Sequence, residues 1–189
     1  MTYYADLEPC DYFDHLSSVP EYSEIWSPSL RAVGWLDSKV DSTGSVSSSF
    51  RQKLETLARD PWTPVSFAGA HYCGPCLRKI LEKKLEELAR EFPEAPESSM
   101  EAFIHNWGAL HAPASTPQGI LNLFVPGTGI VYVAPKLILH YIDAHEYQPP
   151  AEFCDAVLAC PPMGSVEYFE ALARNSSGDL RKYVGPRGR

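Results

Sequence analysis

The sequence predicts a single α+β domain, and three observations lead to this expectation. Two runs rich in β-branched and aromatic residues, 120–125 and 130–134, flank the Pro- and Gly-containing turn 126–129, which is the pattern of a β-hairpin. Apolar residues recur on one helical face over 77–92. Two proline pairs then divide the second half into short segments. A chain of 189 residues suits one globular domain, expected over 1–175.

The first third of the chain predicts loops, a short strand and one helix around this core. Residues 1–41 are aromatic and dotted with prolines, and their best strand candidate is 31–36. A helix is expected to begin at Ser48 or Ser49 as its N-cap and to end before Asp60-Pro61. A second strand candidate covers 64–68.

The amphipathic helix over 77–92 is the clearest helical pattern, and Pro93 is expected to end it. The following segment to about residue 118 is rich in Ala, Pro and Ser, with a helical turn or two around 100–104.

Short helices are expected after the hairpin. Pro135 suits the first position of a helix over 136–146, and further helices are predicted over 151–159 and after Ser165 as N-cap. The end of the chain, 176–189, is basic and rich in glycine, so it is expected to be a flexible tail.

Charge and cysteine content limit the classes of function. The net charge of -8 argues against nucleic-acid binding, since such proteins need a basic surface. No apolar run approaches the ~20 residues of a membrane span, and the first residues lack a signal-peptide pattern. Five cysteines cannot form a complete disulfide framework. A cytoplasmic protein that does not act on membranes is therefore expected.

The Cys73-Gly-Pro-Cys76 motif has two interpretations. Followed by a strong helix, it resembles the active site of thioredoxin-like oxidoreductases, in which the helix N-terminus stabilises the first thiolate. Such a fold also needs a parallel crossover and a cis-proline opposite the cysteines. The nearest candidate is Pro117, and no parallel crossover is visible in the second half.

The second interpretation is a Zn²⁺ site formed by Cys73, Cys76, His140 and His145. A Cys-x2-Cys turn, a hairpin and a helix with a His-x4-His pair follow one another in the order of a treble-clef-like zinc core, although 63 residues separate Cys76 from His140. Positions five apart on an ideal helix diverge by about 140°. His145 can therefore join His140 only if the helix loosens there, and His71 is the alternative ligand.

Other catalytic patterns are weak in this sequence. A zinc hydrolase with three protein ligands and a water needs an acid/base carboxylate, and Asp143 is the local candidate. There is no nucleophile elbow and no His-Glu-x-x-His motif. An enzymatic function is therefore not the expected one.

Several separated motifs together resemble a family of short, uncharacterised bacterial proteins known only as a domain of unknown function. These motifs are Met-Thr-Tyr-Tyr-Ala-Asp-Leu at 1–7, Gly-Trp-Leu at 34–36, His-x-Cys-x-x-Cys at 71–76 and His-Tyr-x-x-x-His-x-Tyr-x-Pro-Pro at 140–150. The resemblance extends to about residue 159 and implies that Cys73, Cys76, His140, His145 and also His71 belong to one constellation. This chain differs from the family pattern by the helix 77–92 and the segment to about residue 118, so the resemblance implies a helical insertion over 77–118. The family brings no known activity.

The expected function is a small zinc-binding protein whose metal is structural and which acts as a binding or regulatory module on another protein. Two alternatives stay open. One is a thiol-disulfide oxidoreductase with Cys73 as nucleophile and Cys76 as resolving thiol. The other is a toxin-neutralising (immunity) or defence-associated partner, for which a charge of -8 would suit a basic target.

Overall fold

The computed structural model describes residues 3–13, 27–37, 40, 42–64, 71–96, 98–99, 102, 116–178 and 180–185. The strand candidate at 64–68 and the helical turn at 100–104 lie outside these residues, apart from one position each. The described part combines helices with two small sheets, which confirms the predicted α+β class. None of its helices is both long and apolar enough to cross a bilayer.

The predicted hairpin lies in a three-stranded sheet with the order β1-β5-β4. Strands β4 (Asn122–Pro126) and β5 (Val131–Pro135) pair in antiparallel register, with Leu123 opposite Ala134. Strand β1 (Leu30–Ala32) runs parallel to β5 on its other side. Because both strands of the hairpin are almost entirely buried, the sheet forms the centre of the hydrophobic core.

The N-terminal segment wraps the sheet, as the sequence predicts. Its backbone pairs with β1, where Leu7 N–H donates to Ala32 O at 2.8 Å and Ala32 N–H donates to Glu8 O at 2.9 Å. The buried Trp35 follows β1 and donates its Nε1–H to Val133 O at 2.9 Å. The segment is therefore held both by backbone pairing and by a buried indole.

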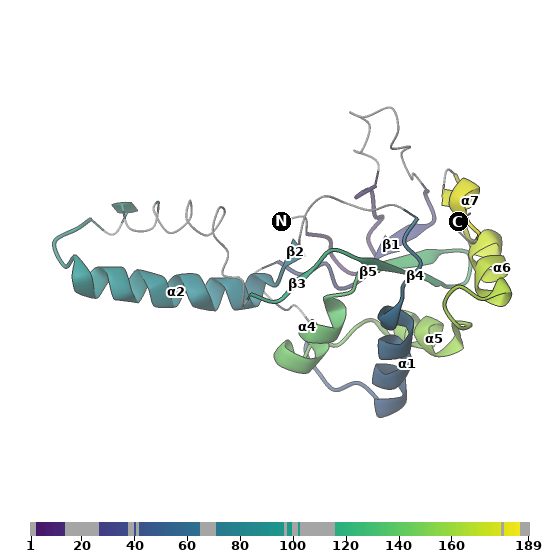
Figure 1. Cartoon of the computed structure of the whole chain (residues 1–189), viewed down its shortest axis with the longest axis horizontal. Coiled ribbons are helices and arrows are strands. Elements are labelled where there is room, and N and C mark those ends of the chain that lie inside the picture. Colours follow the sequence, from purple (N-terminus) through teal and green to yellow (C-terminus); the bar gives the residue numbers. More distant parts are fainter. Residues whose placement is uncertain are drawn as a thin grey trace.

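Helix α1 (Ser48–Arg59) packs below the sheet together with α4 (Ile138–His145) and α5 (Ala151–Ala159) in the view of Figure 1. Its N-cap is Ser47, one residue before the predicted Ser48 or Ser49, because the Ser47 hydroxyl accepts the Phe50 N–H at 3.2 Å. The predicted apolar face is confirmed, since Phe50, Leu54 and Leu57 are fully buried.

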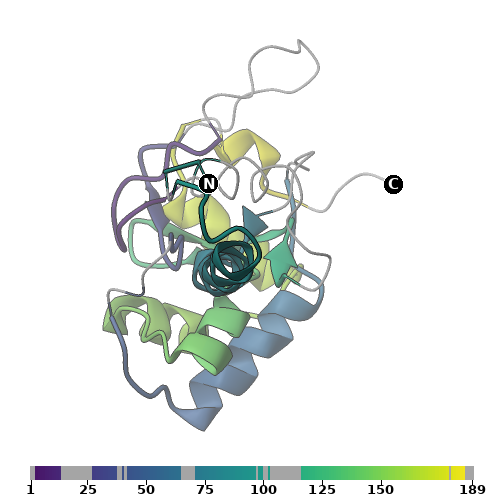
Figure 2. The same ribbon diagram turned by 90° about the vertical axis from the view of Figure 1, so that its left-hand side faces the viewer.

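Helix α2 (Gly74–Glu91) begins three residues before the predicted start at 77, because Cys73 supplies its N-cap. The helix extends away from the rest of the fold in Figure 1 and is seen nearly end-on in Figure 2. Only Gly74 and Pro75 in its first turn are buried. Strand β2 (His71–Tyr72) precedes it and pairs with β3 (Gln118–Gly119).

The last four helices are short. Helix α4 (Ile138–His145) starts later than the predicted 136, since Pro135 ends β5 instead of opening the helix. Helices α5 (Ala151–Ala159) and α6 (Val166–Asn175) agree with prediction, and Ser165 caps α6 as expected. Within the predicted flexible tail 176–189, Leu180–Tyr183 forms α7, because the fully buried Leu180 anchors this segment to the core.

Candidate metal centre

The cysteine half of the site is built at the start of α2. The sulfur of Cys73 caps the helix by accepting the Cys76 N–H at 3.4 Å, so the local fold turns both sulfurs toward one side. The Cys73 N–H donates to Pro117 O at 2.8 Å, next to the β2–β3 pair. Cys73 is fully buried and Cys76 is half-buried.

The histidine half lies on α4, and the end of this helix resolves the geometric objection to His145. Glu146 adopts a left-handed conformation with φ of 55°, and its N–H bonds to Tyr141 O, five residues back instead of four. The last turn is therefore wider than an ideal α-helical turn. Both imidazoles reach the same point, with their Nε2 atoms 3.2 Å apart.

The four predicted residues converge. The His145 Nε2 lies 3.1 Å from the Cys73 sulfur and 3.3 Å from the Cys76 sulfur, and His140 Nε2 lies 3.3 Å from the Cys76 sulfur. All four ligand atoms are within 4.8 Å of one another. A tetrahedral Zn²⁺ with Zn–S of ~2.3 Å and Zn–N of ~2.0 Å would separate sulfur from nitrogen by about 3.5 Å. The group thus has nearly the dimensions of a four-ligand metal site.

The protonation of these residues responds to their surroundings. Burial lowers the pKa of His140 and His145, and the neighbouring His140 lowers the pKa of His145 further. Both imidazoles are therefore neutral at neutral pH, the form that binds a metal. Burial raises the pKa of the Cys73 thiol to about 12. A bound cation would reverse this effect by stabilising the thiolate.

His71 lies outside this group, although the resemblance implied that it belongs to it. Its Nε2 is buried and makes no hydrogen bond to any described residue, and its ring lies edge-on to Trp35, with centroids 5.9 Å apart. Burial lowers the pKa of His71 as well, so this side chain is a neutral part of the interior.

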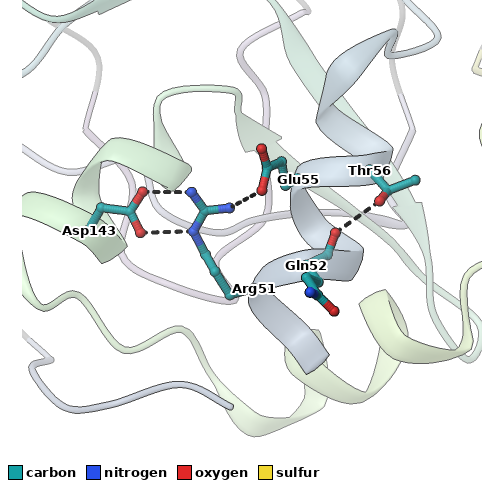
Figure 3. Close-up of polar contacts among 5 residues, drawn as sticks. All are labelled: Arg51, Gln52, Glu55, Thr56 and Asp143. Atoms are coloured by element: carbon teal, nitrogen blue, oxygen red, sulfur yellow. Dashed lines mark hydrogen bonds and ion pairs between the residues drawn. The ribbon is translucent and has the colours of Figure 1, made fainter. Parts of the chain in front are cut away.

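Asp143, the candidate acid/base of a zinc hydrolase, is engaged elsewhere. Figure 3 shows that both its carboxylate oxygens face Arg51 of α1, with Nε to Oδ1 at 2.8 Å and Nη2 to Oδ2 at 2.6 Å. The hydrogen bond from Arg51 lowers the pKa of the Asp143 carboxyl, so this group holds no proton to give at neutral pH. Glu55 extends the pair, since its carboxylate accepts a hydrogen bond from Arg51 Nη1 at 3.3 Å.

Asp6, Gly34 and Tyr147 form a largely buried, hydrogen-bonded group beside the end of α4, here called the polar triangle. Sequence patterns did not reveal this group. The Tyr147 hydroxyl donates to the Asp6 carboxylate, whose two oxygens are both 2.8 Å away, and the Gly34 N–H donates to Asp6 Oδ1 at 2.9 Å. Gly34 has φ of +71°, and a Cβ there would lie 3.0 Å from Ile138. The sequence could have pointed to these three residues, because each of them falls within one of the motifs that carry the family resemblance.

Comparison with protein-family models places this chain in a family. A family model described as "Domain of unknown function (DUF7919)" matches residues 2–158, which include the polar triangle and all four members of the Cys/His group. Neither the curated proteins nor the solved structures contain a match to the chain.

Proposed function

We propose that this chain, which belongs to the DUF7919 family, is a zinc-binding protein in which Cys73, Cys76, His140 and His145 hold one structural Zn²⁺. One observation carries the proposal: two sulfurs and two imidazole nitrogens, from segments more than 60 residues apart, converge within 4.8 Å. Two pairs that are distant in sequence and so close in space are the arrangement of a metal site.

The donor set favours zinc as the ion. Thiolate and imidazole ligands in a tetrahedral group are typical of structural Zn²⁺ sites, and two thiolates balance the charge of the ion. Four protein ligands leave no open position for a substrate or an activated water. Because Arg51 also occupies the Asp143 carboxylate, the arrangement supports a structural role better than a hydrolytic one.

The structural ion would join two parts of the fold. Cys73 and Cys76 belong to the first turn of α2, whereas His140 and His145 belong to α4, which packs in the core. We propose that the protein so organised is a cytoplasmic binding or regulatory module for another protein. The five free cysteines support a reducing compartment, and the net charge of -8 supports a basic partner.

Metal analysis of the purified protein tests the zinc proposal. We expect about one zinc per chain, lost in the double variant Cys73→Ser/Cys76→Ser and in His140→Ala/His145→Ala. The matched controls Cys154→Ser and His71→Asn change the same residue types outside the group and should keep the ion. Less than roughly 0.3 zinc per chain in the unaltered protein, with no loss of stability on chelation, would rule out the proposal.

A thiol-disulfide oxidoreductase is the second candidate, and one contact favours it. Pro117 lies beside the cysteines, with its carbonyl accepting the Cys73 N–H, but its peptide bond is trans and not the cis bond that this fold needs. Against it, the buried Cys73 thiol has a raised pKa instead of the lowered pKa of a redox nucleophile. Insulin reduction by the metal-free, reduced protein measures this activity, and activity that survives Cys73→Ser would exclude the mechanism.

A further inference from the structure

A cavity of about 480 Å³ lies between the hairpin turn and α5. Thr128 and Ile130 of the turn, Tyr132 of β5, and Glu152 and Asp155 of α5 contribute to its lining. The cavity is lined by the turn end of the hairpin. The other end of β5 leads to α4 (Figure 1), which carries His140 and His145 of the Cys/His group. It is therefore a feature separate from the metal centre.

Tyr132 places an unpartnered polar group in this cavity. Only 4% of the residue is exposed, and its ring packs edge-on against Phe153 with centroids 5.6 Å apart. Its hydroxyl makes no hydrogen bond to any described residue and keeps some exposure, so a ligand in the cavity can reach it. Burial and the negative charge of Glu152 raise the pKa of Tyr132, so the hydroxyl stays neutral beside a carboxylate.

Two carboxylates in the cavity lining also lack a positive partner. Glu152 and Asp155 are exposed, and neither forms an ion pair with any described residue. They are three residues apart on α5, so they lie on the same side of the helix. A ligand that donates several hydrogen bonds and carries a positive charge would satisfy both carboxylates and the Tyr132 oxygen together.

We propose that this cavity binds the basic side chain, arginine above all, of a protein partner. A guanidinium matches this site because it donates in a planar fork to carboxylates, while its methylenes can contact Ile130 and the small residues of the wall. The net charge of -8 would attract such a partner. The inference deepens the proposed role as a module acting on another protein, and it is independent of the zinc site.

Titration of the zinc-loaded, full-length protein with the peptide acetyl-Gly-Arg-Gly-amide tests the proposal, with binding followed by the NMR signals of backbone amides. We expect saturable shifts at Gly127, Thr128 and Asp155, which weaken as salt rises because the attraction is screened. The same peptide with neutral citrulline in place of arginine should give no saturable shift. Equal binding of the citrulline peptide, or no shift at the cavity with arginine, overturns the proposal.

Variants decide which groups bind the peptide. We expect Glu152→Gln/Asp155→Asn to weaken binding about tenfold, since two partly exposed charge contacts are lost. Tyr132→Phe should weaken it about threefold without disturbing the fold, because its hydroxyl has no partner within the described structure. The matched control Glu82→Gln/Glu91→Gln removes the same charge from the exposed face of α2 and should leave affinity unchanged. Equal weakening by this control would show a net-charge effect and overturn the site.

Two further readouts separate this proposal from others. Spermidine binding more than about tenfold tighter than the arginine peptide would identify a free polyamine as the ligand and overturn the protein partner. All variants of the cavity should retain about one zinc per chain, because the metal group lies elsewhere. If the purified protein binds the peptide but contains no zinc, the metal proposal alone is refuted. If it contains zinc but does not bind the peptide, the cavity proposal alone is refuted.

Discussion

Helices α1 and α2 have similar amphipathic sequence patterns, but their apolar faces are buried to very different extents in the fold. The 12 residues of α1 bury Phe50, Leu54, Leu57 and Ala58 against the core. The 18 residues of α2 bury only Gly74 and Pro75, and the predicted apolar stripe is half-buried or exposed, namely Leu77, Ile80, Leu81, Leu85, Leu88 and Phe92. A periodic apolar face therefore predicts a helix without specifying what covers that face.

The two helices differ in how they are attached. The α1 side chains lie among α4, α5 and the sheet, so hydrophobic packing holds that helix along its length. The described attachments of α2 are concentrated at its first turn, where Cys73 bonds to Pro117 and both cysteines contact histidines of α4. Because core packing holds α1, whereas contacts at the first turn hold α2, we expect the proposed metal ion to stabilise α2 more than α1.

Metal removal is expected to give the largest contrast between the two helices. Structural zinc contributes on the order of 10 kcal/mol in small zinc domains, so chelation should release the first turn of α2. We expect hydrogen exchange of the Cys76 and Leu77 amides to rise at least about tenfold, while amides of α1 and β5 stay protected. Hydrogen exchange followed by mass spectrometry, with and without chelator, measures the effect.

Cys73→Ser separates the metal role of this residue from its helix-capping role. A serine hydroxyl is a good N-cap but a poor zinc ligand, so α2 should keep its helical content while zinc affinity falls at least about a hundredfold. Circular dichroism and zinc competition measure the two properties. If α2 in the chelated protein exchanges as slowly as in the zinc-loaded protein, packing holds the helix and the contrast with α1 disappears.

A matched pair of leucine truncations should give the next largest effect. Leu54→Ala in α1 removes a fully buried side chain and is expected to cost about 2–5 kcal/mol of unfolding free energy. Leu85→Ala in α2 removes a half-buried side chain and should cost under about 1.5 kcal/mol. Urea denaturation of both variants compares them, and equal costs would mean that α2 is packed as firmly as α1.

Loss of the N-cap of α1 should have a smaller effect. Ser47→Ala removes the acceptor of the Phe50 N–H, which is expected to cost about 1 kcal/mol. Ser47→Asp keeps an acceptor at the same position and is the control. In thermal denaturation, the unaltered protein and Ser47→Asp should have nearly the same melting temperature, and Ser47→Ala should have a lower one. A Ser47→Ala variant as stable as the unaltered protein would show that α1 depends on packing alone.

The ion pair between α1 and α4 should contribute least. Asp143→Asn removes a bidentate contact whose carboxylate is 53% exposed, so we expect a loss of less than about 1 kcal/mol and an unchanged zinc content. Arg51→Gln in the same measurement should cost a similar amount or slightly more, because it breaks the same pair and also the exposed contact of Arg51 with Glu55. A much larger loss from Asp143→Asn than from Arg51→Gln would give Asp143 a further role at the metal centre.

The sequence by itself determined the local features of this protein. β-branched runs around a turn specified the β4–β5 hairpin, Ser165 specified the start of α6, and the Cys-x2-Cys and His-x4-His pairs specified the candidate ligands. Each of these depends on residues a few positions apart, and propensity and hydrogen-bond chemistry act over that range.

Only the tertiary structure decided how these parts combine. It selected His145 instead of His71, because the left-handed Glu146 widens the end of α4 and the Tyr147–Asp6 contact anchors the chain just beyond the helix. It also left α2 without the deep burial of α1, although both sequences are amphipathic. Contacts between distant segments depend on how the whole core closes, and no short pattern encodes that closure.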